Sequence, residues 1–285
     1  MRDSLFWELV MPDEQLGMQI YLYLTDRGRT GYNVVVWGEQ RAEPIALKLA
    51  SGVVDESADL DAFSFGGLTL KQPELRKTCE VQFRSDDINI DFDFDAIHDA
   101  FSYRSNPDGL PEWFAQNRLE QSGRVRGFLE VGSRRVEFDR IGHRDHSWGV
   151  RDWGVPQHWK WFIAYTPSGR VVNGWIWIAC GEWGFAGYVV KDGVTVPVRT
   201  IEHRAEYDQS MTQRRLEADV LDVTGEVTHL SMESFGAVTL PTHDPLSTVI
   251  IEAACVASID GEVGAGQFET HWQGTYRQYL AQRRQ

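Results

Sequence analysis

Alternation of apolar and polar residues is the feature that most constrains how this 285-residue chain folds. In DINIDFDFD (residues 87–95), every second residue is apolar, so one face of an extended segment carries Ile88, Ile90, Phe92 and Phe94. A period of two is typical of a β-strand with one face in a core and the other in water. Residues 19–26 and 32–39 carry β-branched or aromatic residues on both faces, which predicts strands buried on both sides.

Turn residues divide these runs into hairpins. Four glycines each lie between two extended runs, at Gly132, Gly193, Gly225 and Gly261. Helix signals are confined to residues 110–121, with Pro111 near the start, and to residues 276–285. Strands do not alternate with helices, which disfavours a parallel α/β fold. We therefore expect an all-β protein of short antiparallel strands, either a sandwich or a barrel.

The turn-rich piece WGVRDWGVPQ (residues 148–157) interrupts the strand pattern near the middle of the chain. It contains two glycines and Pro156, and about half of the chain lies on each side. Each half is of ordinary size for one domain. We therefore predict an N-terminal β domain at residues 1–153 and a C-terminal β domain at residues 154–285. Pockets are common at such junctions.

Composition and missing motifs exclude several classes of function. A net charge of −14 would repel a phosphate backbone, so nucleic acid is not an expected partner. Three cysteines without paired spacing predict free, mostly buried thiols instead of disulfides or a zinc site. No apolar run is long enough for a transmembrane helix, and the expected location is the cytoplasm. Neither GxGxxG after a strand nor GxSxG is present, so we expect no nucleotide or flavin cofactor and no serine nucleophile.

The segment GHRDHSWGVRDWG (residues 142–154) concentrates ionisable and aromatic residues. In an extended chain, His143, Asp145 and Ser147 share one face, while the opposite face carries Arg144, His146 and Trp148. Because the two histidines point to opposite faces and no HExxH or CxxC accompanies them, we expect no metal site. Burial against tryptophan would raise the pKa of Asp145 and make it a proton donor, whereas a paired arginine would keep it ionised. A purely structural network of Arg, Asp and His at the junction remains an equal alternative.

Tryptophan is abnormally frequent, with eleven residues in the chain and seven of them between positions 148 and 183. Trp159 and Trp161 share one face of a predicted strand, as do Trp175 and Trp177, and a hairpin at residues 167–169 would place the two pairs side by side. Four indoles on one wall form either a heavy core or the lining of an apolar cavity. Aromatic faces also stabilise cations, and a neighbouring carboxylic acid could protonate an alkene.

The run RDHSWGVRDW (residues 144–153) resembles the DHxWG-type motif of the carotenoid 1,2-hydratase (hydroxyneurosporene synthase) and AttH-like superfamily. The segments FWELVMPDEQLGMQIYLYL (residues 6–24) and GAGQFETHWQG (residues 264–274) look like its opening and closing strands. The resemblance implies two lipocalin-like antiparallel β-barrels, or strongly bent sheets, packed together with few short helices around an apolar cavity. It also implies chemistry on polyenes, prenylated molecules or polyketides without a metal or redox cofactor. Ser147 departs from the more usual Asn of the motif.

These observations predict a cofactor-independent acid/base enzyme, a hydratase, dehydratase or cyclase, that acts on a hydrophobic, terpenoid-type small molecule. Asp145 is the expected acid, with His146 or Asp152 directing water or removing the final proton. The expected substrate-binding residues are Trp148, Arg151, Trp159, Trp161, Trp175 and Trp177. The alternatives are a non-catalytic lipocalin-like carrier of a lipophilic ligand, a Diels-Alderase or isomerase of a polyketide, and a structural protein with a filled core.

Overall fold

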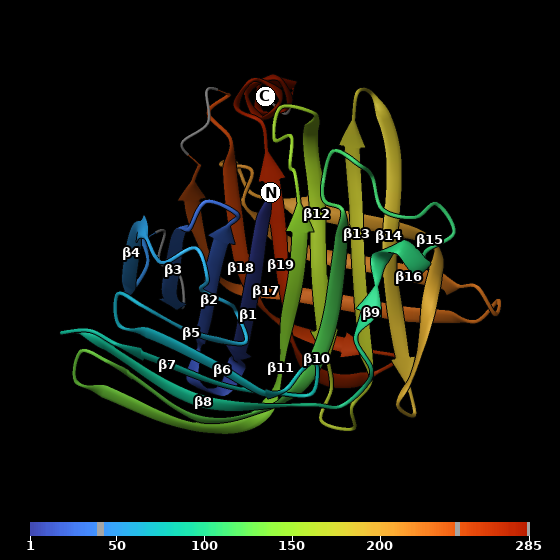
Figure 1. Cartoon of the computed structure of the whole chain (residues 1–285). Helices are drawn as coiled ribbons and strands as arrows, with labels where there is room; N and C mark the ends of the chain where they lie inside the picture. Colours follow the sequence, from blue (N-terminus) through green and yellow to red (C-terminus); the bar gives the residue numbers. More distant parts are fainter. Residues whose placement is uncertain (39–42, 243–245, 284–285) are drawn as a thin grey trace.

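The computed structural model describes residues 1–38, 43–242 and 246–283. It consists of an eleven-stranded curled sheet and a closed eight-stranded barrel, which lie against each other (Figure 1). The all-β, lipocalin-like prediction is confirmed, with a barrel in the second half of the chain and a strongly bent sheet in the first. Within the described residues, no helix is both long and apolar enough to cross a membrane.

The curled sheet occupies the first half of the chain. Its strands are β1 (Arg2–Met11), β2 (Leu16–Thr25), β3 (Arg29–Gly38), β4 (Ala46–Val53), β5 (Ala62–Phe65), β6 (Leu68–Glu74), β7 (Thr78–Arg84), β8 (Ile88–Ala96), β9 (Phe101–Ser102), β10 (Asn117–Val131) and β11 (Arg134–Gly149). The spatial order is β4-β3-β2-β1-β11-β10-β8-β7-β6-β5, and β9 pairs with β10. The apolar face predicted for β8 is buried in the core enclosed by the curl.

The barrel follows in simple up-and-down order. Its strands are β12 (Pro156–Tyr165), β13 (Val171–Ala179), β14 (Glu182–Lys191), β15 (Val194–Tyr207), β16 (Gln213–Asp222), β17 (Val227–Pro241), β18 (Val249–Ile259) and β19 (Glu262–Trp272). Pairing of β12 with β19 closes it. A buried apolar cluster that includes Phe162, Leu216, Met232 and Phe268 joins strands around the barrel. Phe162 lies on the face of β12 opposite to Trp159 and Trp161, so this cluster fills the interior, while the tryptophans face the sheet.

The turns confirm the hairpins expected from the glycines. Asp192 and Gly193 have φ values of 51° and 76°, and Asp260 and Gly261 have 48° and 88°. Two successive residues with positive φ are the geometry of a type I′ hairpin turn, which glycine tolerates best. The connection from sheet to barrel runs from the end of β11 at Gly149 to the start of β12 at Pro156, within the turn-rich piece.

Of the two predicted helices, only the C-terminal one forms. Helix α1 spans Gly274–Arg283, and the remaining helical elements among the described residues are the short 3-10 turns η1 (Pro12–Glu14) and η2 (Tyr103–Ser105). The helix expected at residues 110–121 is wrong: residues 112–114 form a turn, and Asn117 begins β10. Pairing of β10 with β11 on one side and with β9 on the other overrides the local helical pattern.

A separate aromatic cluster holds the sheet against the barrel. From the sheet it takes Phe6, Val10, Val35 and Trp37, and from the barrel Trp159, Trp161, Tyr165, Trp175, Trp177 and Tyr188. Tyr165 crosses this interface, because its hydroxyl accepts a hydrogen bond from the Val10 backbone N–H at 3.2 Å. The interface is thus a third core, distinct from those of the sheet and the barrel.

Candidate functional site

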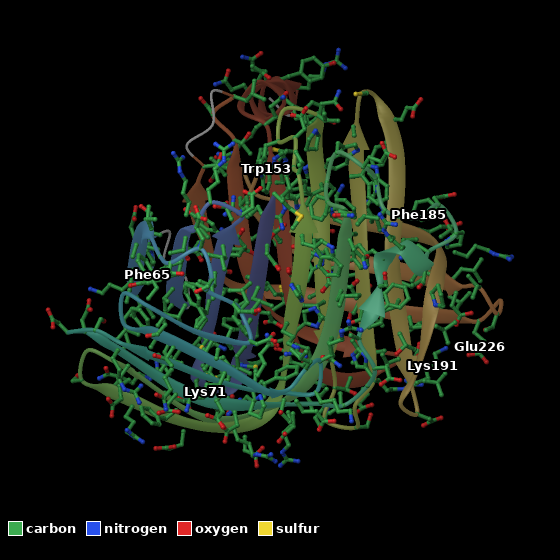
Figure 2. All side chains as sticks on the ribbon, in the orientation of Figure 1. Phe65, Lys71, Trp153, Phe185, Lys191 and Glu226 are labelled. Atoms are coloured by element: carbon green, nitrogen blue, oxygen red, sulfur yellow. The ribbon has the colours of Figure 1, made fainter. Side chains whose placement is uncertain are left out.

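A cavity of about 390 Å³ opens between the sheet and the outer wall of the barrel. Its lining comes from strands far apart in the sequence: Arg2, Phe6, Gln19, Tyr21, Asn33, Phe114, Arg118, Asp145, Ser147, Arg151, Trp153, Trp159, Trp161, Leu240, Thr242, Ile250, Glu252 and Glu269. Figure 2 labels Trp153, which lies near the upper end of the molecule in this view, where the chain passes from sheet to barrel. The size is that of an ordinary small-molecule pocket.

Aromatic side chains form one wall of this cavity. Trp159 and Trp161 project from β12 towards the sheet, because alternate residues of a strand share a face. The Trp161 ring meets Phe6 edge-on at 6.2 Å, and the Trp153 and Trp159 ring centroids are 5.4 Å apart. These contacts fix the rings, so the wall is apolar and rigid.

Trp175 and Trp177 share the face of Trp159 and Trp161 but lie behind the wall instead of lining the cavity. Their ring centroids are 4.3 Å apart, and the Trp175 ring is 4.4 Å from that of Phe114, which does line the cavity. They therefore support Phe114. Alternation had placed these tryptophans on the correct face, but it did not distinguish positions that line the cavity from positions that are packed behind it.

Asp145 is held in a buried charge network on neighbouring strands. The β10–β11 register places it beside Glu120, and Arg118 bridges the two carboxyls. The Arg118 Nη2 atom lies 2.9 Å from Asp145 Oδ2, and its Nε–H donates to Glu120. Glu120 also accepts hydrogen bonds from His143 at 2.5 Å and from Trp161 Nε1 at 3.2 Å.

The pKa values of the two carboxyls are shifted in opposite directions. Burial raises the pKa of Glu120, but Arg118 and His143 outweigh it, so the pKa lies below the ordinary value. For Asp145, burial is the largest effect and the neighbouring Glu120 adds to it, so the pKa is raised although Arg118 opposes the shift. Arg118 thus pairs with both carboxyls, but burial dominates at Asp145, which retains a proton more readily than a free aspartate.

A second carboxyl pair, Glu252 and Glu269, lines the cavity from the barrel side. The two residues are opposite each other on β18 and β19. Trp159 Nε1 donates to Glu269 at 2.5 Å, and Gln267 Nε2 donates to Glu252 at 2.7 Å. Burial raises the pKa of both carboxyls, and that of Glu252 lies well above its ordinary value because Glu269 adds to the effect. Two such adjacent carboxyls share one proton.

Sequence reasoning missed most of this polar lining. Arg118 was missed because it lay within the expected helix, together with Phe114, which lines the same cavity, and Glu120, which pairs with Arg118. Glu269 is the glutamate of the closing segment of the family resemblance, but no role was predicted for it. The single acidic residue in the apolar run VIIEAACV was the available signal for Glu252.

Of the other predicted residues, Arg151 lines the cavity, while His146, Trp148 and Asp152 do not. The His146 side chain faces away from Asp145, with Nε2 2.7 Å from Asp3 Oδ1 and its ring 5.1 Å from that of Trp148. Asp152 is exposed in the connection and accepts a hydrogen bond from the Gly154 backbone N–H. The structure therefore brings together Asp145, Arg151 and two of the four tryptophans of the predicted wall.

No group of three or more His, Cys, Asp or Glu side chains suited to a metal ion occurs in the part of the chain that the structure describes. The three cysteines are free, with Cys79 and Cys255 buried and Cys180 exposed. The cavity therefore offers carboxyl, guanidinium and indole groups for acid–base chemistry.

Comparison with solved structures shows the same fold in two proteins. One is the crystal structure of a protein assigned as AttH from Nitrosomonas europaea, with a TM-score of 0.65 and 14% identity over 95% of this chain and 92% of the other. The other is kievitone hydratase from Nectria haematococca, with a TM-score of 0.63 and 12% identity over 96% of this chain and 89% of the other. No curated protein matches the sequence. A family model described as a domain of unknown function, DUF7064, matches residues 1–274, and the chain therefore belongs to that family.

Proposed function

We propose that this protein is a cofactor-independent enzyme that adds water to, or removes it from, an apolar terpenoid-type small molecule. One observation carries the proposal: Asp145, a buried carboxyl with a raised pKa, lines the same cavity as Trp153, Trp159 and Trp161. The resemblance of the RDHSWG segment to hydratases of the AttH-like superfamily supports it, as does the fold shared with kievitone hydratase. In this proposal residues 1–153 and 154–285 are two domains, and the site lies between them.

The proposed reaction begins with a proton. The Asp145 carboxyl donates its proton to one carbon of a double bond, which leaves a carbocation and an aspartate. The faces of Trp159 and Trp161 stabilise the cation. Water then adds to the cation and loses a proton to the ionised member of the Glu252–Glu269 pair. The product is an alcohol, the carboxyl groups exchange the remaining proton through water, and dehydration is the reverse sequence.

His146 and Asp152 have no role in this scheme because they do not line the cavity. Glu269 takes their place, since it lies on the opposite wall from Asp145 and close enough for the two charges to influence each other. A positioned acid or base contributes about 10²–10⁴-fold to a rate, so exclusion of bulk water and positioning of the substrate would supply the rest.

The test is turnover of a panel of isoprenoids, such as geraniol, linalool and geranic acid, in water enriched in ¹⁸O. Mass spectrometry of the products should show incorporation of the label by the wild type and its loss in Asp145→Asn. Asp139→Asn is the matched control, because Asp139 is on the same strand but exposed. Full activity of Asp145→Asn would refute the proposal. Binding of the panel without any conversion would favour the non-catalytic carrier.

The Asp145→Asn variant should melt within a few degrees of the wild type, because Glu120 still neutralises Arg118. Loss of the fold in this variant would instead support a structural role for Asp145.

A further inference from the structure

Three arginines line the cavity, but within the part of the chain that the structure describes only one of them forms an ion pair with a carboxylate. Arg118 is paired with Asp145 and Glu120. Arg2 and Arg151 have no carboxylate within 4.0 Å among the described residues. Burying a guanidinium group is unfavourable unless an anion joins it, and these two partly buried arginines form no ion pair in the described structure, although Asp145 acts on Arg151 at longer range.

Arg151 is held in place by neutral groups. Its Nη2 donates to the hydroxyls of Ser4 at 2.9 Å and Ser147 at 2.5 Å, and both serines are buried. The guanidinium carbon lies 5.5 Å from the Phe114 ring centroid and 5.9 Å from that of Trp153. These contacts orient the group without neutralising it. Burial lowers the pKa of Arg151, although its side chain is only partly buried.

Arg2 places a second positive charge near the first. Its guanidinium carbon lies 4.0 Å from the Tyr23 ring centroid and 5.4 Å from that of Tyr21, while its Nε atom is buried without a hydrogen-bond partner in the described structure. The two arginines are close enough for the charge of Arg2 to lower the pKa of Arg151. Two like charges that share a cavity favour binding of an anion between them.

We infer that the ligand of this cavity carries a carboxylate, which Arg151 and Arg2 bind while its apolar body lies along Phe6, Trp159 and Trp161. A guanidinium presents two parallel N–H donors, which match the two oxygens of a carboxylate. The inference rests on the proposed function for the apolar, terpenoid-type body of the ligand. It narrows the proposed substrate class from terpenoid-type molecules to terpenoid-type carboxylic acids.

This assignment links binding to chemistry. Arg151 is one of the charges that oppose the raised pKa of Asp145. A carboxylate that neutralises Arg151 would remove part of that opposition, so the pKa of Asp145 would rise further when the ligand is bound. The acid would then be protonated chiefly when a substrate is present to receive the proton.

The test compares geranic acid with its uncharged methyl ester, methyl geranate. Binding is followed at pH 7.5 by quenching of tryptophan fluorescence, because Trp153, Trp159 and Trp161 line the cavity. We expect the wild type to bind the acid at least about ten-fold more tightly than the ester, as a charge-assisted contact requires. Arg151→Met and Arg2→Met should each lose this preference and still bind the ester like the wild type, which shows that they fold.

Arg140→Met is the matched control. Arg140 is paired with Asp13 outside the cavity, so this variant should keep the preference for the acid. The inference is overturned if the wild type binds the acid no better than the ester, or if both cavity variants retain the preference. This experiment measures binding only, so its outcome is independent of the ¹⁸O turnover experiment. If the protein binds the acid selectively but incorporates no label in that experiment, the proposed function is refuted and the carboxylate site still stands.

Discussion

Replacing Glu120 by Gln removes the charge at the centre of the buried network. The Glu120 side chain is wholly buried, and its oxygens accept hydrogen bonds from Arg118, His143 and Trp161. Breaking a buried ion pair by removing one partner costs about 3–5 kcal/mol. Glutamine keeps the volume and part of the hydrogen bonding, so we expect the lower end, about 3 kcal/mol. For a protein of this size that lowers the melting temperature by about 6–12 °C.

The effect should depend on pH in a defined direction. The pKa of Glu120 is lowered in the folded state, so its contribution to stability is fully present above the pKa of an unfolded glutamate, about 4.3. That contribution is lost as the pH falls through the lower folded-state value. The difference in melting temperature between wild type and variant should therefore be large at pH 7 and shrink under acidic conditions.

The assay is thermal unfolding followed by tryptophan fluorescence at pH 7. Glu130→Gln is the control, because Glu130 lies on the same strand but forms an exposed ion pair with Arg135. Exposed pairs contribute little, so this control should melt close to the wild type. Equal melting of Glu120→Gln and Glu130→Gln would refute the reasoning that the network holds a buried, ionised carboxylate.

Two further predictions concern stability. His98 is buried, its Nε2 accepts the Ser122 backbone N–H at 2.8 Å, and burial lowers its pKa to about 4. Because the unfolded chain binds this proton near pH 6.5, stability should fall between pH 6.5 and 4, and His98→Gln should show a smaller fall in melting temperature over that range; equal falls would contradict the assignment. A Cβ at Gly184 would lie 2.2 Å from the Trp177 ring, so Gly184→Ala should cost about 1–3 kcal/mol in urea unfolding. Gly154→Ala is the control, because a Cβ there would lie 3.2 Å from Asp152 Oδ1, and equal stabilities of the two variants would show that the Trp177 ring has room to move.

Local signals in the sequence predicted the strands well but not how they close. The alternation in β8 and the turn at Asp260–Gly261 are properties of a few consecutive residues, so they are readable without knowledge of the rest of the chain. Closure of the barrel depends on β12 pairing with β19, more than a hundred residues apart. No local pattern specifies that contact, and sequence reasoning left barrel and bent sheet as alternatives for each half.

The same distinction between local and distant information applies to the site. Asp145 and Trp159 could be singled out because each belongs to a short, unusual segment whose alternation sets its direction. Glu252 and Glu269 acquire their importance only when the outer wall of the barrel meets the sheet. His146 was favoured through its neighbour Asp145, although alternation had already placed it on the opposite face. Side chains of adjacent residues in a strand point to opposite faces, so they seldom line the same cavity.

The central claim is that ligands bind between the sheet and the barrel and not inside the barrel. A crystal structure of the protein soaked with methyl geranate tests it most directly. The account predicts the ligand between Asp145 and Trp159, with the barrel interior still filled by Phe162 and Phe268. A ligand lodged among Phe162 and Phe268 would contradict the account, because the carboxyl groups proposed to transfer protons would then lie outside the binding site.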